Sequence, residues 1–265
     1  MNLRLGASVY GFFAGRERDS WPSIAGAVRS IRQLDPRLGV EIWAARGPDD
    51  AGPTSVEERE IIEACTGAPF LSMHARERYW TWDPAGLRSE IDLAHRLGAR
   101  TMVVHPESLG LDDASARPDV PEIRRVLDHA RRRDVRMVLE NTVDSLRALD
   151  RALDIAEDDS TFGICVDIGH AALSRDAGRH PVRAYVERYG GRLVHLHLHD
   201  TMGTRDDHMV PGHGRVDWTG VQSVLRKVAY GGPAVLEVVP GLDAMGSATP
   251  SDLLREAIAF LSTVA

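Results

Sequence analysis

The residues of this sequence that could carry chemistry are carboxylates and imidazoles that recur at the ends of short apolar runs. Two of them, Glu140 and Glu237, stand among valines and leucines, where a carboxylate is costly unless it is paired, protonated or bound to a metal. Carboxylate and imidazole ligands suit zinc, manganese, cobalt and iron. The pattern predicts a divalent metal site. Its candidate ligands are His74, His105, Glu140, Asp167, His197 and Glu237 at these runs, and His170, Asp206 and His208 in the loops that follow two of them.

The three imidazoles of one run need separate assignments, because His195, His197 and His199 alternate with leucines and therefore share one face of a strand. We take His197 as the ligand and place His195 deeper in the protein interior. His199 and Asp200 are expected to support the metal ligands or the loop that follows, and His199 is also a candidate substrate-binding residue.

The elements that must position these residues are short β-branched runs alternating with longer segments of helical period. This alternation is typical of βαβ units on a parallel sheet. Eight such pairs predict a (β/α)8 TIM barrel, a single domain over residues 1–265, with the donors gathered at the carboxyl ends of the strands. A doubly wound open sheet is the competing arrangement, but no GxGxxG follows the first run. The expected strands are 3–9, 38–43, 69–74, 100–105, 136–140, 162–167, 192–198 and 233–238, and the expected helices are 21–34, 55–66, 84–97, 119–133, 143–156, 180–189, 217–229 and 250–263.

Composition narrows the function classes. The 265 residues are 43% hydrophobic and 27% charged, which is ordinary for a globular protein with a large core. The formal charge of -7 argues against a nucleic-acid partner, although a local basic groove could hide within it. Cys65 and Cys165 have no CxxC spacing and are expected to be reduced core thiols. Without a long apolar run, we expect no membrane association and a cytoplasmic location.

Several motifs together resemble the xylose isomerase-like TIM barrel superfamily, which includes sugar-phosphate isomerases and epimerases, inosose dehydratase and the endonuclease IV family. The motifs are SMHA at 72–75, VVHPES at 103–108, VLENT at 138–142, CVDIGHA at 165–171, HLHLHD at 195–200, DDHMVPGHGRVDW at 206–218 and VLEV at 235–238.

The resemblance implies how many metal ions the donors hold. Glu140, Asp167, His197 and Glu237 match the mononuclear site of the isomerase and epimerase members, which hold Mn²⁺, Co²⁺, Zn²⁺ or Mg²⁺. With the other five donors they match the trinuclear zinc pattern of the endonuclease IV family. One ion, Mn²⁺ or Zn²⁺, or as many as three are therefore expected.

Two enzyme functions follow, and a third class is less favoured. The first is a metal-dependent sugar, sugar-phosphate or cyclitol isomerase or epimerase, in which Glu140 and Glu237 move a proton next to a carbonyl. A dehydratase would share the first half of that reaction. The alternative is a multinuclear zinc phosphodiesterase of the endonuclease IV type. A barrel that only binds would be expected to have lost some donors, and none is missing.

The segment 75–84 (ARERYWTWDP) reads as a lid over a small sugar-like substrate, because aromatic faces stack on sugar C–H surfaces and arginine can hold an anion. The aromatic residues that follow the first strand, Tyr10 among them, could line the same pocket. A homo-oligomer is left open. The residues predicted to bind substrate are Arg76, Trp80, Trp82, His199 and His213.

Overall fold

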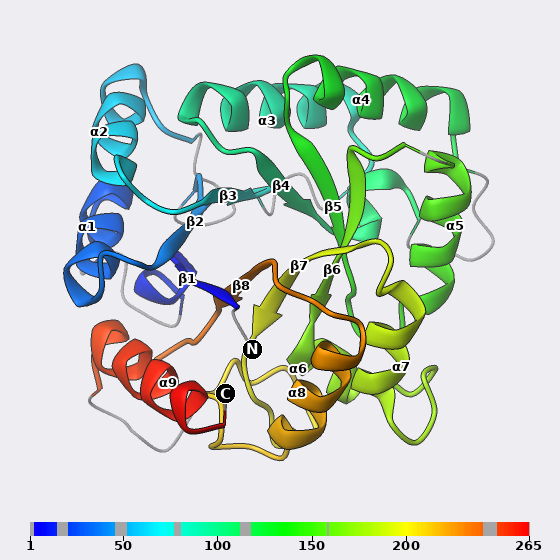
Figure 1. Cartoon of the computed structure of the whole chain (residues 1–265). Coiled ribbons are helices and arrows are strands. Elements are labelled where there is room, and N and C mark those ends of the chain that lie inside the picture. The colour runs from blue at the N-terminus through cyan, green and yellow to red at the C-terminus, as the bar shows by residue number, and fades with distance from the viewer. Residues whose placement is uncertain are drawn as a thin grey trace.

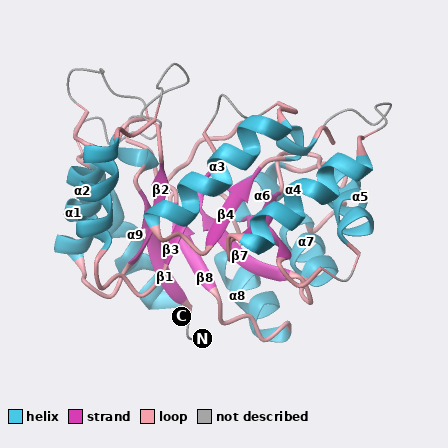
Figure 2. Ribbon diagram, turned by 90° about the horizontal axis from the view of Figure 1, so that it is seen from above, coloured by secondary structure: helices cyan, strands magenta, loops and turns pink. Residues whose placement is uncertain are grey.

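The computed structural model describes residues 3–14, 21–45, 52–76, 81–111, 118–157, 159–240 and 248–264. Its parallel strands form a closed barrel in the order β1 to β8, with β8 paired to β1. Helices surround the strands in chain order, and α9 packs beside α1 and α8 to complete the ring (Figures 1 and 2). The predicted single TIM barrel is confirmed.

The strands are β1 (Arg4–Ser8), β2 (Gly39–Trp43), β3 (Leu71–His74), β4 (Thr101–Val104), β5 (Arg136–Glu140), β6 (Phe162–Asp167), β7 (Leu193–Leu198) and β8 (Pro233–Leu236). The helices are α1 (Ile24–Leu34), α2 (Ser55–Cys65), α3 (Pro84–Leu97), α4 (Val120–Arg132), α5 (Leu146–Ala156), α6 (Ile168–Leu173), α7 (Pro181–Tyr189), α8 (Trp218–Lys227) and α9 (Pro250–Val264). Two 3₁₀ turns, Tyr10–Phe12 and Pro106–Leu109, follow β1 and β4.

Helix α6 differs from the sequence prediction, which expects no helix between residues 156 and 180. The helix forms because Asp167, the last residue of β6, accepts the backbone N–H of His170 and so caps it. The same kind of cap explains several predicted helix starts. Thr54 and Glu57 form a capping box at α2, and Asp217 caps α8.

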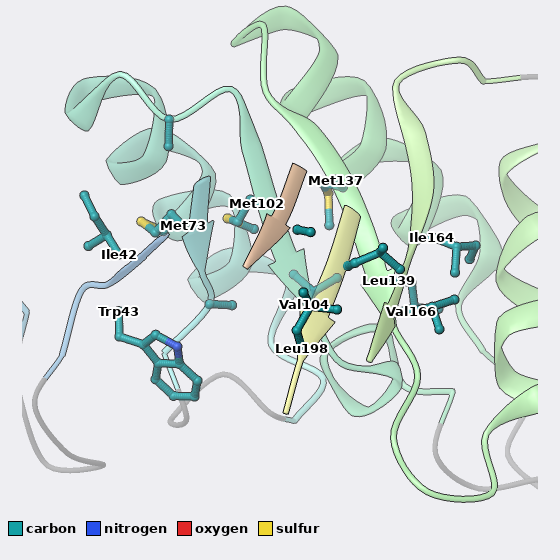
Figure 3. Close-up of a cluster of buried hydrophobic side chains, with 14 of the residues drawn as sticks. Ile42, Trp43, Met73, Met102, Val104, Met137, Leu139, Ile164, Val166 and Leu198 are labelled. Atoms are coloured by element: carbon teal, nitrogen blue, oxygen red, sulfur yellow. The ribbon is translucent and has the colours of Figure 1, made fainter. Parts of the chain in front are cut away.

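Each strand has two buried faces, which explains its nearly continuous burial. Outward residues such as Ile42, Met73 and Met102 pack under the helices in the main apolar core (Figure 3). The inward residues alternate with them, and Val103, Val138 and Cys165 form a small separate cluster. The period of two then turns the next inward position of β5 and β6, Glu140 and Asp167, toward the barrel mouth.

The cysteines are as expected, since Cys65 and Cys165 are both free and buried. Among the helices that the structure describes, none has the length and apolar character needed to cross a membrane.

Candidate metal centre

Four of the predicted ligands meet at the carboxyl ends of four neighbouring strands. His197 Nδ1 lies 3.3 Å from Glu140 Oε2 and 3.4 Å from Glu237 Oε2. Asp167 Oδ2 lies 3.9 Å from the same nitrogen. One donor atom from each of the four lies within 4.8 Å of the others, which is the spacing of atoms that can share one ion.

A second group lies on the side of β3 and β4. His74 Nε2 lies 3.1 Å from Glu140 Oε2, and His105 Nε2 lies 3.3 Å from the same oxygen. Glu140 therefore belongs to both groups. Trp43, at the end of β2, stacks on the His74 ring at 4.2 Å between centroids and so holds it at a fixed angle.

A third group lies toward solvent on α6 and the segment after β7. Asp206 Oδ2 lies 3.2 Å from His170 Nε2 and 3.1 Å from His208 Nε2. His199 is part of this group rather than outside it, with its ring stacked on His208 at 4.1 Å. Gly169 permits this arrangement, because a Cβ there would lie 2.0 Å from the His199 ring.

His208 occupies an unusual backbone conformation, with φ of 46°, which costs free energy for a residue other than glycine. Two hydrogen bonds hold it there. Its carbonyl accepts the N–H of Val239, and its Nδ1 lies 2.8 Å from the Glu237 carbonyl oxygen. The imidazole Nε2 is thereby directed at Asp206.

Three carboxylates of the centre have lowered pKa values. Burial by itself would raise the pKa of Glu140, but the charges of His197 and His105 hold it well below its ordinary value. For Asp167 burial again opposes ionisation, and His170 and His199 lower its pKa. Hydrogen bonds with His170 and His208 likewise lower the pKa of Asp206 against the effect of burial.

The imidazoles respond in the opposite direction. Burial would lower the pKa of His170, yet Asp167 and Asp206 raise it well above its ordinary value. His208 is affected similarly by Asp206, which raises its pKa to about 9 against the effect of burial. The cluster attracts positive charge, which protons supply when no metal is bound.

Buried donor atoms without hydrogen bonds provide a test of whether the residues fit a metal ion. Among the described residues, Asp167 Oδ2, Glu237 Oε1 and His197 Nδ1 are buried and complete no hydrogen bond. Unsatisfied buried polar atoms are costly and rare. Their concentration in the central group, with two oxygens and one imidazole nitrogen, fits a divalent cation.

The family follows from comparison over nearly the whole chain. A family model described as xylose isomerase-like TIM barrel matches residues 4–264. The chain belongs to this family.

The relatives and solved structures that this chain resembles are distant in sequence. "Uncharacterized protein y4fM" of Sinorhizobium fredii is 30% identical over 180 residues, which is 63% of this chain and only 56% of that relative's own length. A solved "L-ribulose 3-epimerase" superposes with a TM-score of 0.74 at 13% identity, over 99% of this chain and 94% of that one. D-Psicose 3-epimerase from Clostridium cellulolyticum H10, solved with D-tagatose, gives a TM-score of 0.70 at 16% identity over 99% and 98%. At these identities the structures show a shared fold.

Glu41, a buried carboxylate of this xylose isomerase-like barrel, was not among the predicted site residues. Glu41 lies on β2, inside the barrel, with its Oε2 2.9 Å from His195 Nε2 and its Oε1 3.0 Å from His197 Nε2. A carboxylate in the middle of the run GVEIW was a signal of the same kind as Glu140. The interior position predicted for His195 agrees with the structure, in which its side chain is fully buried.

Two residues predicted to bind substrate have carboxylate partners within the protein. Arg76 is buried in an ion pair with Glu90 of α3, where its Nε donates to Glu90 Oε1 at 2.8 Å. A buried guanidinium needs such a partner, and the pairing with Glu90 engages its Nε. His213 is half-buried, with its Nε2 2.7 Å from Glu256 on α9. We therefore leave both out of the proposed substrate contacts.

Three aromatic residues were also predicted to lie at the substrate pocket, namely Trp80, Trp82 and Tyr10. Trp80 lies outside the described residues. Trp82 is half-buried and packs against Gly110 beyond β4, so its ring covers the end of the 3₁₀ turn that follows His105. Tyr10 stacks on Trp43 at 4.5 Å and lies edge-on to His208 at 5.8 Å, which places it beside the centre.

Proposed function

We propose that this protein is a divalent-metal-dependent sugar isomerase or epimerase that moves a proton next to a carbonyl. The observation that carries the proposal is the central group, in which the buried carboxylates of Glu140 and Glu237 both lie within 3.4 Å of His197 Nδ1. The likeness in fold to the sugar 3-epimerases named above supports the choice of a sugar-like substrate.

The residues that would hold the metal are Glu140, Asp167, His197 and Glu237. A divalent cation bound there supplies Lewis-acid charge, which makes the hydrogen next to a substrate carbonyl more acidic. Manganese and zinc both suit this mixture of oxygen and nitrogen donors.

The protein's own contribution is the placement of two bases. Glu140 ends β5 and Glu237 follows β8, so the two carboxylates approach the centre from different strands. We assign one to remove the proton from carbon and the other to return it, on the same carbon for epimerisation or on its neighbour for isomerisation. Their side chains are only 2% and 4% exposed, so the site shields the reacting carbon from bulk water, and the carboxyl groups exchange their protons with solvent between turnovers.

Metal binding is tested first. Zinc and manganese content of the purified protein is measured by elemental analysis for the unaltered chain, Glu140→Gln and Glu237→Gln, with Glu187→Gln on the surface of α7 as the matched control. We expect about one ion per chain in the unaltered protein and the control. The two site variants should retain much less metal after purification, because we expect their affinity to fall at least roughly tenfold. Full retention in both site variants would contradict the metal assignment.

Proton abstraction is tested separately by incubating a panel of ketoses and keto-cyclitols with the metal-loaded protein in deuterated water. NMR should detect deuterium at the carbon next to the carbonyl, and Glu140→Gln and Glu237→Gln should each slow this by about 10²-fold or more. A fully loaded protein that exchanges no substrate in the panel would count against the isomerase assignment.

A second candidate, a multinuclear zinc phosphodiesterase, has one observation in its favour. Glu140 belongs to two donor groups, and His170 Nδ1 of the third lies 3.2 Å from Glu140 Oε1, so the groups adjoin. About three zinc ions per chain, with zinc-dependent hydrolysis of bis(4-nitrophenyl) phosphate, would favour this function. About one ion and no hydrolysis would favour the isomerase.

A further inference from the structure

Glu41 is a fully buried carboxylate that takes no part in the proton transfer described above. It stands at the centre of β2, and its side chain points into the barrel beneath the metal centre. A buried charge on this strand is costly unless it has partners, so a carboxylate at this position needs a structural or functional explanation.

The partners of Glu41 are divided between its two oxygens. Oε2 accepts a hydrogen bond from Ser72 Oγ at 2.9 Å and lies 2.9 Å from His195 Nε2. Oε1 lies 3.0 Å from His197 Nε2, a close contact that does not complete a hydrogen bond in this structure. Ser72 lies directly opposite Glu41 in the β2–β3 register, so the carboxylate is anchored on one side and directed toward β7 on the other.

The imidazole of His197 is consequently held between two sets of carboxylates. Its Nε2 faces Glu41, inside the barrel, and its Nδ1 faces Glu140 and Glu237 at the mouth. A ring that binds a cation through Nδ1 must carry its proton on Nε2. A carboxylate beside the second nitrogen selects this tautomer and fixes the ring orientation.

We propose that Glu41 is a positioning residue, which holds His197 with its proton on Nε2 and its Nδ1 free for the metal ion. This inference rests on the proposed role of His197 as a metal ligand. Glu41 acts through His197 and touches neither substrate nor metal. His195 holds the other carboxylate oxygen in place, and Ser72 adds one hydrogen bond to that same oxygen.

The test compares zinc affinity, measured by competition with a chromophoric chelator, in the unaltered protein, Glu41→Gln and Ser72→Ala. Glutamine keeps the size of the side chain but removes the charge that favours the Nε2 proton. We expect Glu41→Gln to bind zinc 10- to 100-fold more weakly, as is usual for loss of such a partner. Ser72→Ala, which leaves the contact between Glu41 and His197 in place, should change the affinity by less than about threefold.

A second measurement needs no variant and remains informative if Glu41→Gln does not fold. Long-range ¹H–¹⁵N spectra of the zinc-loaded protein report the state of each imidazole nitrogen. We expect His197 to show a protonated Nε2 and a zinc-bound Nδ1. A zinc-bound Nε2, or a proton on Nδ1, overturns the proposal.

The outcomes separate the two proposals. If the unaltered protein binds no zinc or manganese, the proposed function fails. If it binds zinc and loses it in Glu140→Gln, but a folded Glu41→Gln keeps full affinity, only the role of Glu41 is wrong. A Glu41→Gln variant with lowered melting temperature and unchanged affinity would make Glu41 a structural residue, which also overturns the inference.

Discussion

Asp167 Oδ1 accepts a hydrogen bond from the backbone N–H of His170 at 2.6 Å, while its other oxygen, Oδ2, is buried toward the metal centre. One carboxylate therefore ends β6, caps α6 and offers a donor atom to a cation. The two oxygens have separate tasks, and substitutions can distinguish them.

Asparagine can cap a helix but is a poor metal ligand, so Asp167→Asn should separate these tasks. We expect its free energy of unfolding without metal to stay within about 1 kcal/mol of the unaltered protein, with zinc affinity at least roughly tenfold lower. Asp167→Ala should lose the same affinity and about 1 kcal/mol more stability. Denaturant unfolding and zinc titration measure the two effects. Equal stability of the two variants would show that the cap contributes little.

The metal-free protein should lose stability as the pH rises. The pKa of His208 is about 9 in the folded protein and near its ordinary value of 6.5 in the unfolded chain. The folded state therefore binds its proton more tightly, and this stabilisation is complete below pH 6.5 and lost as the pH rises through 9. For His208 alone the loss is about 3 kcal/mol. His170 and His197, whose pKa values are also raised, act in the same direction.

Denaturant unfolding of chelator-treated protein between pH 6 and pH 9.5 measures this loss. Chelator-treated His208→Asn is the control, because it lacks the titrating imidazole and should lose about 3 kcal/mol less over that range. Parallel curves for the two proteins would contradict the raised pKa of His208.

The buried pair of Arg76 and Glu90 should matter for stability and not for the reaction. Arg76→Met leaves the Glu90 carboxylate buried without its charge partner and should cost about 3–5 kcal/mol. Arg76→Met combined with Glu90→Leu should recover much of this loss, since no buried charge remains. The rate of substrate deuterium exchange per folded molecule should equal that of the unaltered protein. A specific rise in KM in the double variant would return Arg76 to the substrate contacts.

His213 should be dispensable for binding. Its contact with Glu256 is partly exposed, with side chains 29% and 38% accessible, and such pairs contribute about 1 kcal/mol or less. His213→Asn should therefore melt close to the unaltered protein and show an unchanged KM. An increase in KM of more than roughly tenfold, without loss of stability, would place His213 at the substrate.

The sequence alone determined the barrel and the donors at its mouth. Alternation of apolar runs and helical segments predicted β1 to β8 within a few residues, because strands buried on both faces require such runs. The donors could be predicted for a similar reason. Residues such as Glu140 and Asp167 end their strands, and the carboxyl ends of parallel strands meet at one face whatever the details of packing.

Tertiary structure alone decided which side chains face one another. Glu41 and His195 are 154 positions apart, and only the closure and register of the barrel bring β2 and β7 within hydrogen-bond distance across its interior. Arg76 shows how packing adds a partner that the local sequence does not reveal. Its neighbours suggest a lid, but helix α3 places the buried carboxylate of Glu90 beside it, and a buried guanidinium is stabilised by such a partner. Residue type and local period specify where a donor stands on its strand. Its partners depend on distances between strands and helices, which no local pattern contains.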